Sequence, residues 1–168
     1  VRNFCIGYEE KIQEVGGIDL QILGIGRTGH IGFNEPGSHR NSRTRTITLD
    51  HLTRYDAAPS FQGIEYVPRK AITMGIQTIL SAKRVLLMAW GTNKAEIIQK
   101  AIEGAISPMI PTTYLQLHKN MTLVLDHEAA SELTRIKTPW LVSHCKWDEA
   151  LRSKAIAWLC STTAKSIL

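Results

Sequence analysis

A run of glycines, a histidine and a glutamate lie together in residues 23–38, LGIGRTGHIGFNEPGS, and could bind an anion and transfer protons. Glycine has no Cβ, so backbone N–H groups in such a segment can approach a ligand closely. His30 titrates near neutral pH, and Glu35 supplies a carboxylate five residues later. This pair suits proton transfer on a small anionic substrate. The alternative is that His30 caps a turn and Glu35 is a solvated loop acid.

The same glycines raise the possibility of a dinucleotide site. Gly24, Gly26 and Gly29 match G-x-G-x-x-G directly after a predicted strand. That fingerprint needs a long helix after the third glycine and an acidic residue about 20 positions later. Here a Pro-Gly pair at 36–37 ends any helix early, and arginines flank Thr44 where the acid is expected. The pattern therefore argues against NAD(P).

The elements around this motif alternate between strand and helix. Apolar spacing predicts an amphipathic helix over residues 3–15, and a short branched run predicts a buried strand over 18–24. Later segments predict strands at 43–49, 71–74, 84–90 and 121–126, and helices at 76–82, 94–104, after Pro111 and at 148–161. The strands at 84–90 and 121–126 are apolar enough to predict burial, on both faces for 84–90. We expect an α/β, Rossmann-like parallel sheet with helices on both faces and ligands at the carboxyl ends of the strands.

Lys94 is a second candidate for anion binding. It follows the predicted strand 84–90 and a Gly-Thr-Asn turn at 91–93, which is expected to cap the helix 94–104. A lysine in the first turn opposes the helix dipole, so its position suggests an anion between the two. By contrast, His118 and His127 are expected to be ordinary core or surface histidines, and the sequence contains no metal-ligand cluster.

These motifs together resemble the glucosamine-6-phosphate deaminase (isomerase) family. The resemblance begins with GHIGFNEPGS at 29–38 and SRTR at 42–45, and it spans residues 18–137. It continues through VPRKAITMG at 67–75, GTNKA at 91–95, AIEG at 101–104 and LQLH at 115–118. The related phosphogluconolactonases share the Gly-His core but lack Phe-Asn-Glu-Pro, so the deaminase branch is favoured.

The resemblance implies conversion of glucosamine 6-phosphate and water to fructose 6-phosphate and ammonia, without a cofactor or metal. It assigns the opening of the sugar ring to His30. Glu35 is expected to orient the His30 imidazole and to tune its charge. Thr28 stands where the family has an aspartate. The loss of that negative charge should lower the pKa of the His30 imidazole. Gly26, Gly29 and Lys94 are the expected substrate-binding residues, with Lys94 on the phosphate.

Two further family features are only partly present. Ser38 and Arg45 match an allosteric site for N-acetylglucosamine 6-phosphate, but the lysine expected two residues after that arginine is Ile47. A phosphate-binding arginine expected near Pro59 is also absent. Either another cation substitutes for it, or the substrate preference differs.

The chain of 168 residues predicts one domain. The family has a substantial portion before the main motif, including a C2 base and a phosphate loop. We therefore expect residues 1–139 to be the C-terminal part of a longer α/β domain that is inactive alone, and residues 140–168 to be a helical extension. Three tryptophans in that extension are expected to anchor its terminal helix.

Composition limits the partners. The net charge of +5 comes partly from Arg40, Arg43, Arg45 and Arg54, which alternate with small polar residues and not with stacking aromatics. A sugar phosphate is therefore a simpler anionic partner than nucleic acid, and the family resemblance implies a phosphorylated amino sugar. Three cysteines without a metal or disulfide pattern, and no apolar run long enough to span a membrane, predict a soluble cytoplasmic protein. Family resemblance adds a homo-oligomer.

Three functions remain open: the deaminase, a lactonase-like or isomerase-like enzyme for another phosphosugar, and a catalytically silent sugar-phosphate sensor. Thr28 and the missing arginine near Pro59 favour the latter two.

Overall fold

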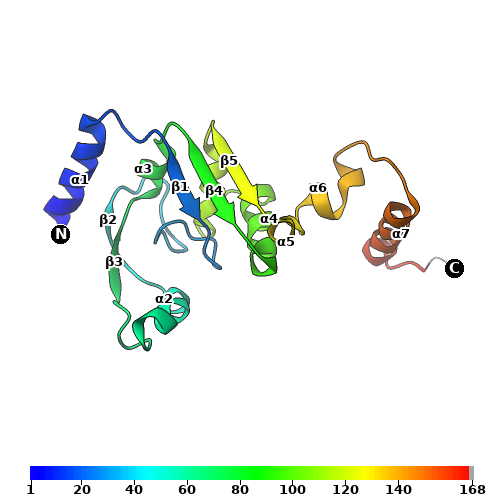
Figure 1. The fold of residues 1–168 in the computed structure, drawn as a ribbon, viewed down its shortest axis with the longest axis horizontal. Coiled ribbons are helices and arrows are strands. Elements are labelled where there is room, and N and C mark those ends of the chain that lie inside the picture. Colours follow the sequence, from blue (N-terminus) through cyan, green and yellow to red (C-terminus); the bar gives the residue numbers. More distant parts are fainter. Residues whose placement is uncertain (167–168) are drawn as a thin grey trace.

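The centre of the molecule is a three-stranded parallel sheet. The structure is a computed structural model that describes residues 1–166. The strand order is β1 (Gln21–Gly24), β4 (Val85–Ala89), β5 (Met121–Leu125), and Figure 1 shows their arrows side by side. Leu23 pairs with Leu87, and Leu87 with Leu123. Because the strands are parallel, their carboxyl ends meet at one edge, where the loop 25–38 begins.

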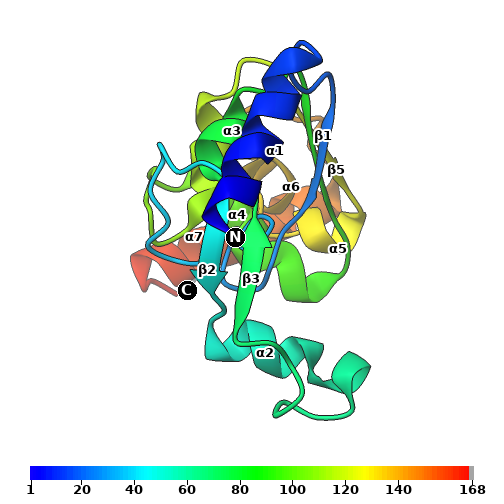
Figure 2. The ribbon, with the colours of Figure 1, turned by 90° about the vertical axis from the view of Figure 1, so that its left-hand side faces the viewer.

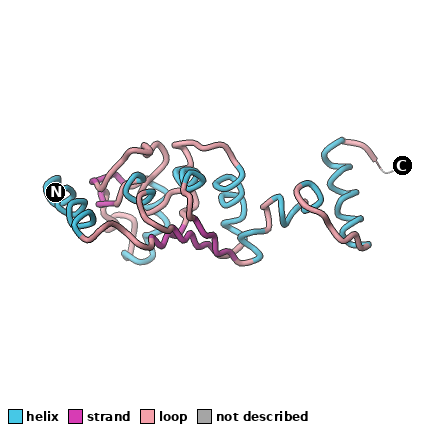
Figure 3. Tube along the Cα trace, turned by 90° about the horizontal axis from the view of Figure 1, so that it is seen from above, coloured by secondary structure: helices cyan, strands magenta, loops and turns pink. Residues whose placement is uncertain are grey.

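One face of this sheet is buried under helical segments. Val85 and Leu87 are fully buried and belong to the same core cluster as Ile79, Ile98 and Leu115. Those three side chains come from α3 (Ile76–Leu80), α4 (Ala95–Glu103) and the 3-10 segment η3 (Pro111–Leu117). Figure 3 shows helical turns stacked on one side of the central strands.

The opposite face is more open than the sequence predicts. Ile22 is 57% exposed and Val124 is 43% exposed, while Leu86 and Met88 are only partly buried. The prediction that strand 84–90 is buried on both faces is therefore wrong, and so are the predictions that the strands at 18–24 and 121–126 are buried. In the part of the chain that the structure describes, helices cover one face, although the parallel α/β class is confirmed.

The predicted strands 43–49 and 71–74 form a second, separate sheet. β2 (Arg45–Thr48) pairs antiparallel with β3 (Lys70–Thr73). Between them the chain forms α2 (His51–Ala57) and the 3-10 segment η1 (Ala58–Phe61), which extend below the sheet in Figure 2. The helix α1 (Arg2–Glu14) packs near β2 and ends before two glycines with positive φ.

The C-terminal part lies to one side of this body. It contains α5 (His127–Ala130), α6 (Thr134–Lys137), the 3-10 segment η4 (Pro139–Leu141) and α7 (Glu149–Thr163), and Figure 1 shows α7 well away from the sheet. Trp140 lies 6.2 Å from Trp147 and 6.0 Å from Trp158 between ring centroids. The predicted helix is confirmed, with Asp148 as its N-cap.

The helix α7 does not contribute to the core. None of the α7 side chains, all of which are described, is buried, and Leu159 is 53% exposed. The last two residues of the predicted extension 140–168 lie outside the described residues. Among the helices of residues 1–166, none is both long and apolar enough to cross a bilayer.

Candidate active site

The loop that follows β1 folds tightly on itself. The Gly26 amide donates to the His30 carbonyl, and the Gly29 amide donates to the Gly26 carbonyl, both at 2.9 Å. These glycines therefore do not present free amide donors, contrary to the expectation for a phosphate-binding loop. Their role is steric at Gly26, since a Cβ there would lie 2.1 Å from the His30 ring. The imidazole thus packs directly against the Gly26 backbone.

A second glycine fixes the loop to η3. Gly29 has φ +77°, and a Cβ there would approach Ile110 Cγ2 to 2.5 Å. Its carbonyl accepts hydrogen bonds from the amide and the hydroxyl of Thr112, at 3.0 and 2.7 Å. Only glycine combines that conformation with this close approach. The backbone before His30 is therefore held by contacts from residues more than 80 positions away.

Asn34 fixes the other half of the loop. It is fully buried, and its Nδ2 donates to the carbonyls of Ile31 and Met74 at 2.9 and 2.8 Å. Its Oδ1 accepts from Arg45 at 2.9 Å, and Arg45 also donates to Ser38 Oγ at 3.1 Å. Sequence reasoning missed this role of Asn34, because its partners come from three separate segments.

The catalytic candidates meet at one ring nitrogen. His30 Nδ1 lies 3.0 Å from Thr28 Oγ1 and 3.4 Å from Glu35 Oε2. The His30 and Glu35 side chains are only 18% and 12% exposed. With the proton on Nδ1, this N–H points to Thr28 or Glu35, and Nε2 keeps a lone pair that can accept a proton. The structure therefore brings together the three residues predicted for catalysis.

Glu35 is an unusual carboxylate in this setting. Within the described chain, neither of its carboxylate oxygens has a hydrogen-bond partner, although both atoms are buried. The 3.4 Å approach to His30 is an ion-pair distance if the imidazole is protonated. Glu35 also lines a cavity of about 330 Å³ together with Ser38 and Arg45. The carboxylate is thus positioned to respond to the charge of His30.

The environment of His30 favours the neutral imidazole. Burial lowers its pKa below 6.5, Glu35 opposes that shift, and the positive charge of Lys94 adds to it. Asp56 and Asp50 raise the pKa more weakly. A neutral imidazole at physiological pH is a competent base.

Lys94 lies beside the same loop. Its Nζ donates to the Ile25 carbonyl at 2.9 Å, one residue before the glycine that contacts the His30 ring. The expectation that the turn at 91–93 caps the helix is wrong, because the N-cap position is Lys94 and no side chain makes a capping hydrogen bond there. Thr92–Lys94 instead form a 3-10 turn, η2, and Lys94 is itself the N-cap residue of α4. The ammonium group therefore reaches back across the strand ends.

Arg54 makes hydrogen bonds to backbone carbonyls of the segment that follows it. Its Nη2 donates to the carbonyls of Ile64 and Val67 at 2.7 and 3.2 Å, which closes the segment around η1. Arg43 likewise contacts Glu9 at 3.4 Å. His118 is held between the Ala82 carbonyl and the Asn120 amide, in agreement with a structural role.

The chain thus combines a parallel α/β sheet with an imidazole–carboxylate pair and a lysine at the carboxyl ends of the strands, the edge at which α/β folds bind their ligands. The sequence model described as glucosamine-6-phosphate isomerases/6-phosphogluconolactonase matches residues 5–124. The chain belongs to this family.

Several relatives are close. A glucosamine-6-phosphate deaminase of Shewanella woodyi is 57% identical over 130 residues, which are 77% of this chain and 49% of that protein. A glucosamine-6-phosphate deaminase-like protein of Bacteroides thetaiotaomicron is 52% identical over 165 residues, 98% of this chain and 25% of that protein. A solved structure described as a monomeric glucosamine-6-phosphate deaminase superposes with a TM-score of 0.74 at 52% identity, covering 76% of this chain and 53% of the other. The chain thus spans about half the length of such deaminases, or less.

Proposed function

We propose that the protein containing this chain converts glucosamine 6-phosphate and water to fructose 6-phosphate and ammonia. The observation that carries the proposal is the contact of His30 Nδ1 with both Thr28 and Glu35, beside the Lys94 ammonium. The relatives named as deaminases support the same substrate.

His30 is assigned to opening the pyranose ring. Its Nε2 accepts the proton of the C1 hydroxyl and returns a proton to the ring oxygen, which breaks the C1–O5 bond and leaves an aldehyde. Glu35 and Thr28 orient the ring through Nδ1, and Glu35 stabilises the imidazolium that forms. A proton then moves from C2 to C1 through an enolamine, and water attacks the resulting imine at C2 to release ammonia.

Lys94 is assigned to the substrate phosphate. An ammonium at the start of α4 attracts a dianion, and its present bond to the Ile25 carbonyl shows how closely it approaches the His30 loop. Ser38 and Arg45 are retained as a proposed effector site, without the lysine that Ile47 replaces.

Thr28 favours a second candidate, a sensor that binds the phosphosugar without turnover. A threonine can hydrogen-bond the imidazole but cannot hold the negative charge that stabilises an imidazolium. Calorimetry of the full-length protein with glucosamine 6-phosphate, combined with an ammonia assay, separates the two. Binding with ammonia supports the deaminase, and binding without ammonia supports the sensor.

A homo-oligomer stays a proposal drawn from the family resemblance. The deaminase whose structure superposes on this chain is described as monomeric. Sedimentation velocity of the full-length protein decides the question.

A further inference from the structure

A carboxylate outside the histidine loop holds the turn that carries Lys94. Asp126 follows β5 directly, so it lies at the same sheet edge as Gly91, which follows β4 by two residues. Both oxygens of Asp126 accept from the Gly91 amide, Oδ2 at 2.9 Å and Oδ1 at 3.1 Å. Asp126 Oδ1 also accepts from the Ala129 amide at 2.7 Å, which caps α5.

Gly91 is the residue on which the geometry of this turn depends. It has φ +85°, a conformation that side-chain-bearing residues rarely adopt. Its amide is fixed by Asp126, and its carbonyl accepts from the Lys94 amide at 3.0 Å. The amide and the carbonyl of Gly91 are therefore both held by hydrogen bonds, which fixes the turn from Gly91 through η2. Lys94 is the last residue of that turn.

These hydrogen bonds of Gly91 account for how the Lys94 side chain can extend to the loop after β1. The lysine lies at the N-terminus of α4, where the helix dipole disfavours a cation. Its Nζ nevertheless donates to the Ile25 carbonyl, across the end of the neighbouring strand. For Lys94 to extend to Ile25, the turn after β4 must hold its present conformation. Asp126, directly after β5, fixes that turn through its hydrogen bonds with the Gly91 amide.

We propose that Asp126 is a positioning residue for phosphate binding: it orients Lys94 through Gly91 without touching the substrate. The inference rests on the proposed function for Lys94. A carboxylate is the suitable group, because it offers two acceptor oxygens to one amide while still capping α5. An asparagine keeps one of those oxygens and replaces the other with a donor.

The test measures KM and kcat for glucosamine 6-phosphate and the affinity for inorganic phosphate in the full-length protein. Asp126→Ala is expected to raise KM and to weaken phosphate binding by about tenfold, with kcat within about twofold, and Asp126→Asn to fall between. Asp148→Ala is the matched control, because Asp148 also caps a helix through one amide, but on α7. Asp148→Ala should change neither KM, nor kcat, nor the affinity for phosphate.

A double-variant cycle separates this inference from the proposed function. In a Lys94→Met background, Asp126→Asn should have no further effect on phosphate affinity, since it acts through the lysine. If Asp126→Ala or Asp126→Asn lowers thermal stability while KM and phosphate affinity stay unchanged, or if the two effects add, the inference is wrong. If no ammonia forms but phosphate binding still depends on both residues, the proposed function fails and the inference stands. If phosphate does not bind at all, both roles are wrong.

Discussion

At the residue scale, the central feature is the competition for His30 Nδ1. Thr28 lies closer than Glu35, at 3.0 against 3.4 Å, but only Glu35 carries a charge. Burial lowers the pKa of His30, and the Glu35 carboxylate limits that shift. We therefore propose different roles for the two partners: Thr28 orients the ring, and Glu35 stabilises its protonated form.

Replacing Glu35 tests the charge. Glu35→Gln removes the negative charge that raises the pKa of His30, so this pKa should fall further below 6.5, as followed by NMR titration of the imidazole. Because protonated His30 then becomes less favourable in the folded state, folding stability should decline more as the pH drops below 6.5. Turnover should fall by roughly tenfold to a hundredfold. An unchanged or higher pKa would contradict the role of Glu35.

Replacing Thr28 tests the departure from the family pattern. Thr28→Asp places a carboxylate beside Nδ1, which now lies 3.0 Å from the Thr28 hydroxyl, and should raise the pKa of His30. Thr28→Ser, which keeps the hydroxyl, serves as the control and should leave the pKa close to that of the parent. If the enzyme is limited by a weakly basic His30, the aspartate variant should release ammonia several-fold faster. Equal pKa values in both variants would show that residue 28 does not contact the ring.

Sequence reasoning at this scale found the residues but not all of their contacts. The types and spacing of His30, Glu35 and Lys94 pointed to proton transfer on an anion. The partners of Gly29 and Asn34 could not be found, because Thr112, Met74 and Arg45 approach them only in the folded chain. Asp126 was part of a predicted strand end, and nothing in the sequence indicated that it contacts Gly91.

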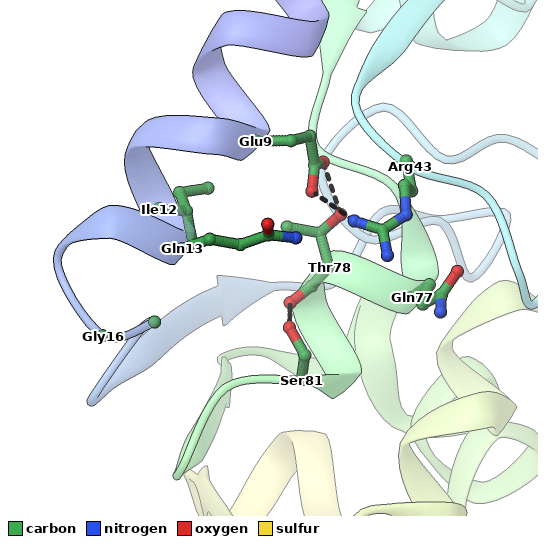
Figure 4. Close-up of a pocket in the computed structure, with 9 residues that line it drawn as sticks. Glu9, Ile12, Gln13, Gly16, Arg43, Gln77, Thr78 and Ser81 are labelled. Atoms are coloured by element: carbon green, nitrogen blue, oxygen red, sulfur yellow. Dashed lines mark hydrogen bonds and ion pairs between the residues drawn. The ribbon is translucent and has the colours of Figure 1, made fainter.

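At the element scale, α1 is fastened to the rest of the molecule by a buried carboxylate. Glu9 accepts hydrogen bonds from the amide and hydroxyl of Thr44, at 2.8 and 2.5 Å, and from the Thr78 hydroxyl at 2.6 Å. Figure 4 shows Glu9 pointing from the helix toward Thr78 and Arg43, in a cavity of about 360 Å³. The side chain thus joins α1 to the segment before β2 and to α3.

The hydrogen bonds of Glu9 should make stability depend on pH. Burial raises the pKa of Glu9, but the bonds from Thr44 and Thr78 and the charge of Arg43 outweigh it, so the pKa lies below 4.5. This stabilisation is present above pH 4.5 and is lost as the pH falls through the lowered pKa. Glu9→Gln should cost about 2 kcal/mol at pH 7 and flatten the acid limb of the stability curve. Glu10→Gln, an exposed neighbour, should do neither, and equal losses would argue against the role of Glu9.

The element predictions failed where a strand's neighbours decide its burial. Alternating and apolar patterns correctly predicted helices near 3–15 and 148–161 and strands at 84–90 and 121–126. They could not reveal that β2 and β3 form their own antiparallel pair. They also overstated the burial of Val124, because an apolar strand reads the same whether one face or two are covered.

At the scale of the whole molecule, we propose that residues 1–139 and 140–168 are separate units. The described α7 residues bury no side chain, and Trp140 packs against both Trp147 and Trp158. A chain ending at residue 139 should therefore keep the melting temperature of the body within about 2 °C. The matched comparison is Leu87→Ala in the buried sheet, which should lower stability by about 2–5 kcal/mol. A large drop on removing 140–168 would show that the two parts fold together.

We propose that the 168 residues of this chain hold only part of the catalytic machinery. The chain spans about half of the deaminases that it matches, and the C2 base expected from the family is not among its assigned residues. We predict negligible ammonia release from these residues alone, against normal release from the full-length protein. A sensitive ammonia assay on both proteins at equal concentration checks this, and normal activity of residues 1–168 would contradict it.

The most direct test of the account compares His30→Asn with the parent full-length protein in one experiment that follows heat of binding and ammonia release together. We predict that both proteins bind glucosamine 6-phosphate with similar affinity, and that the variant releases ammonia at least about a hundredfold more slowly than the parent. Equal ammonia release from the two proteins would contradict the assignment of ring opening to His30.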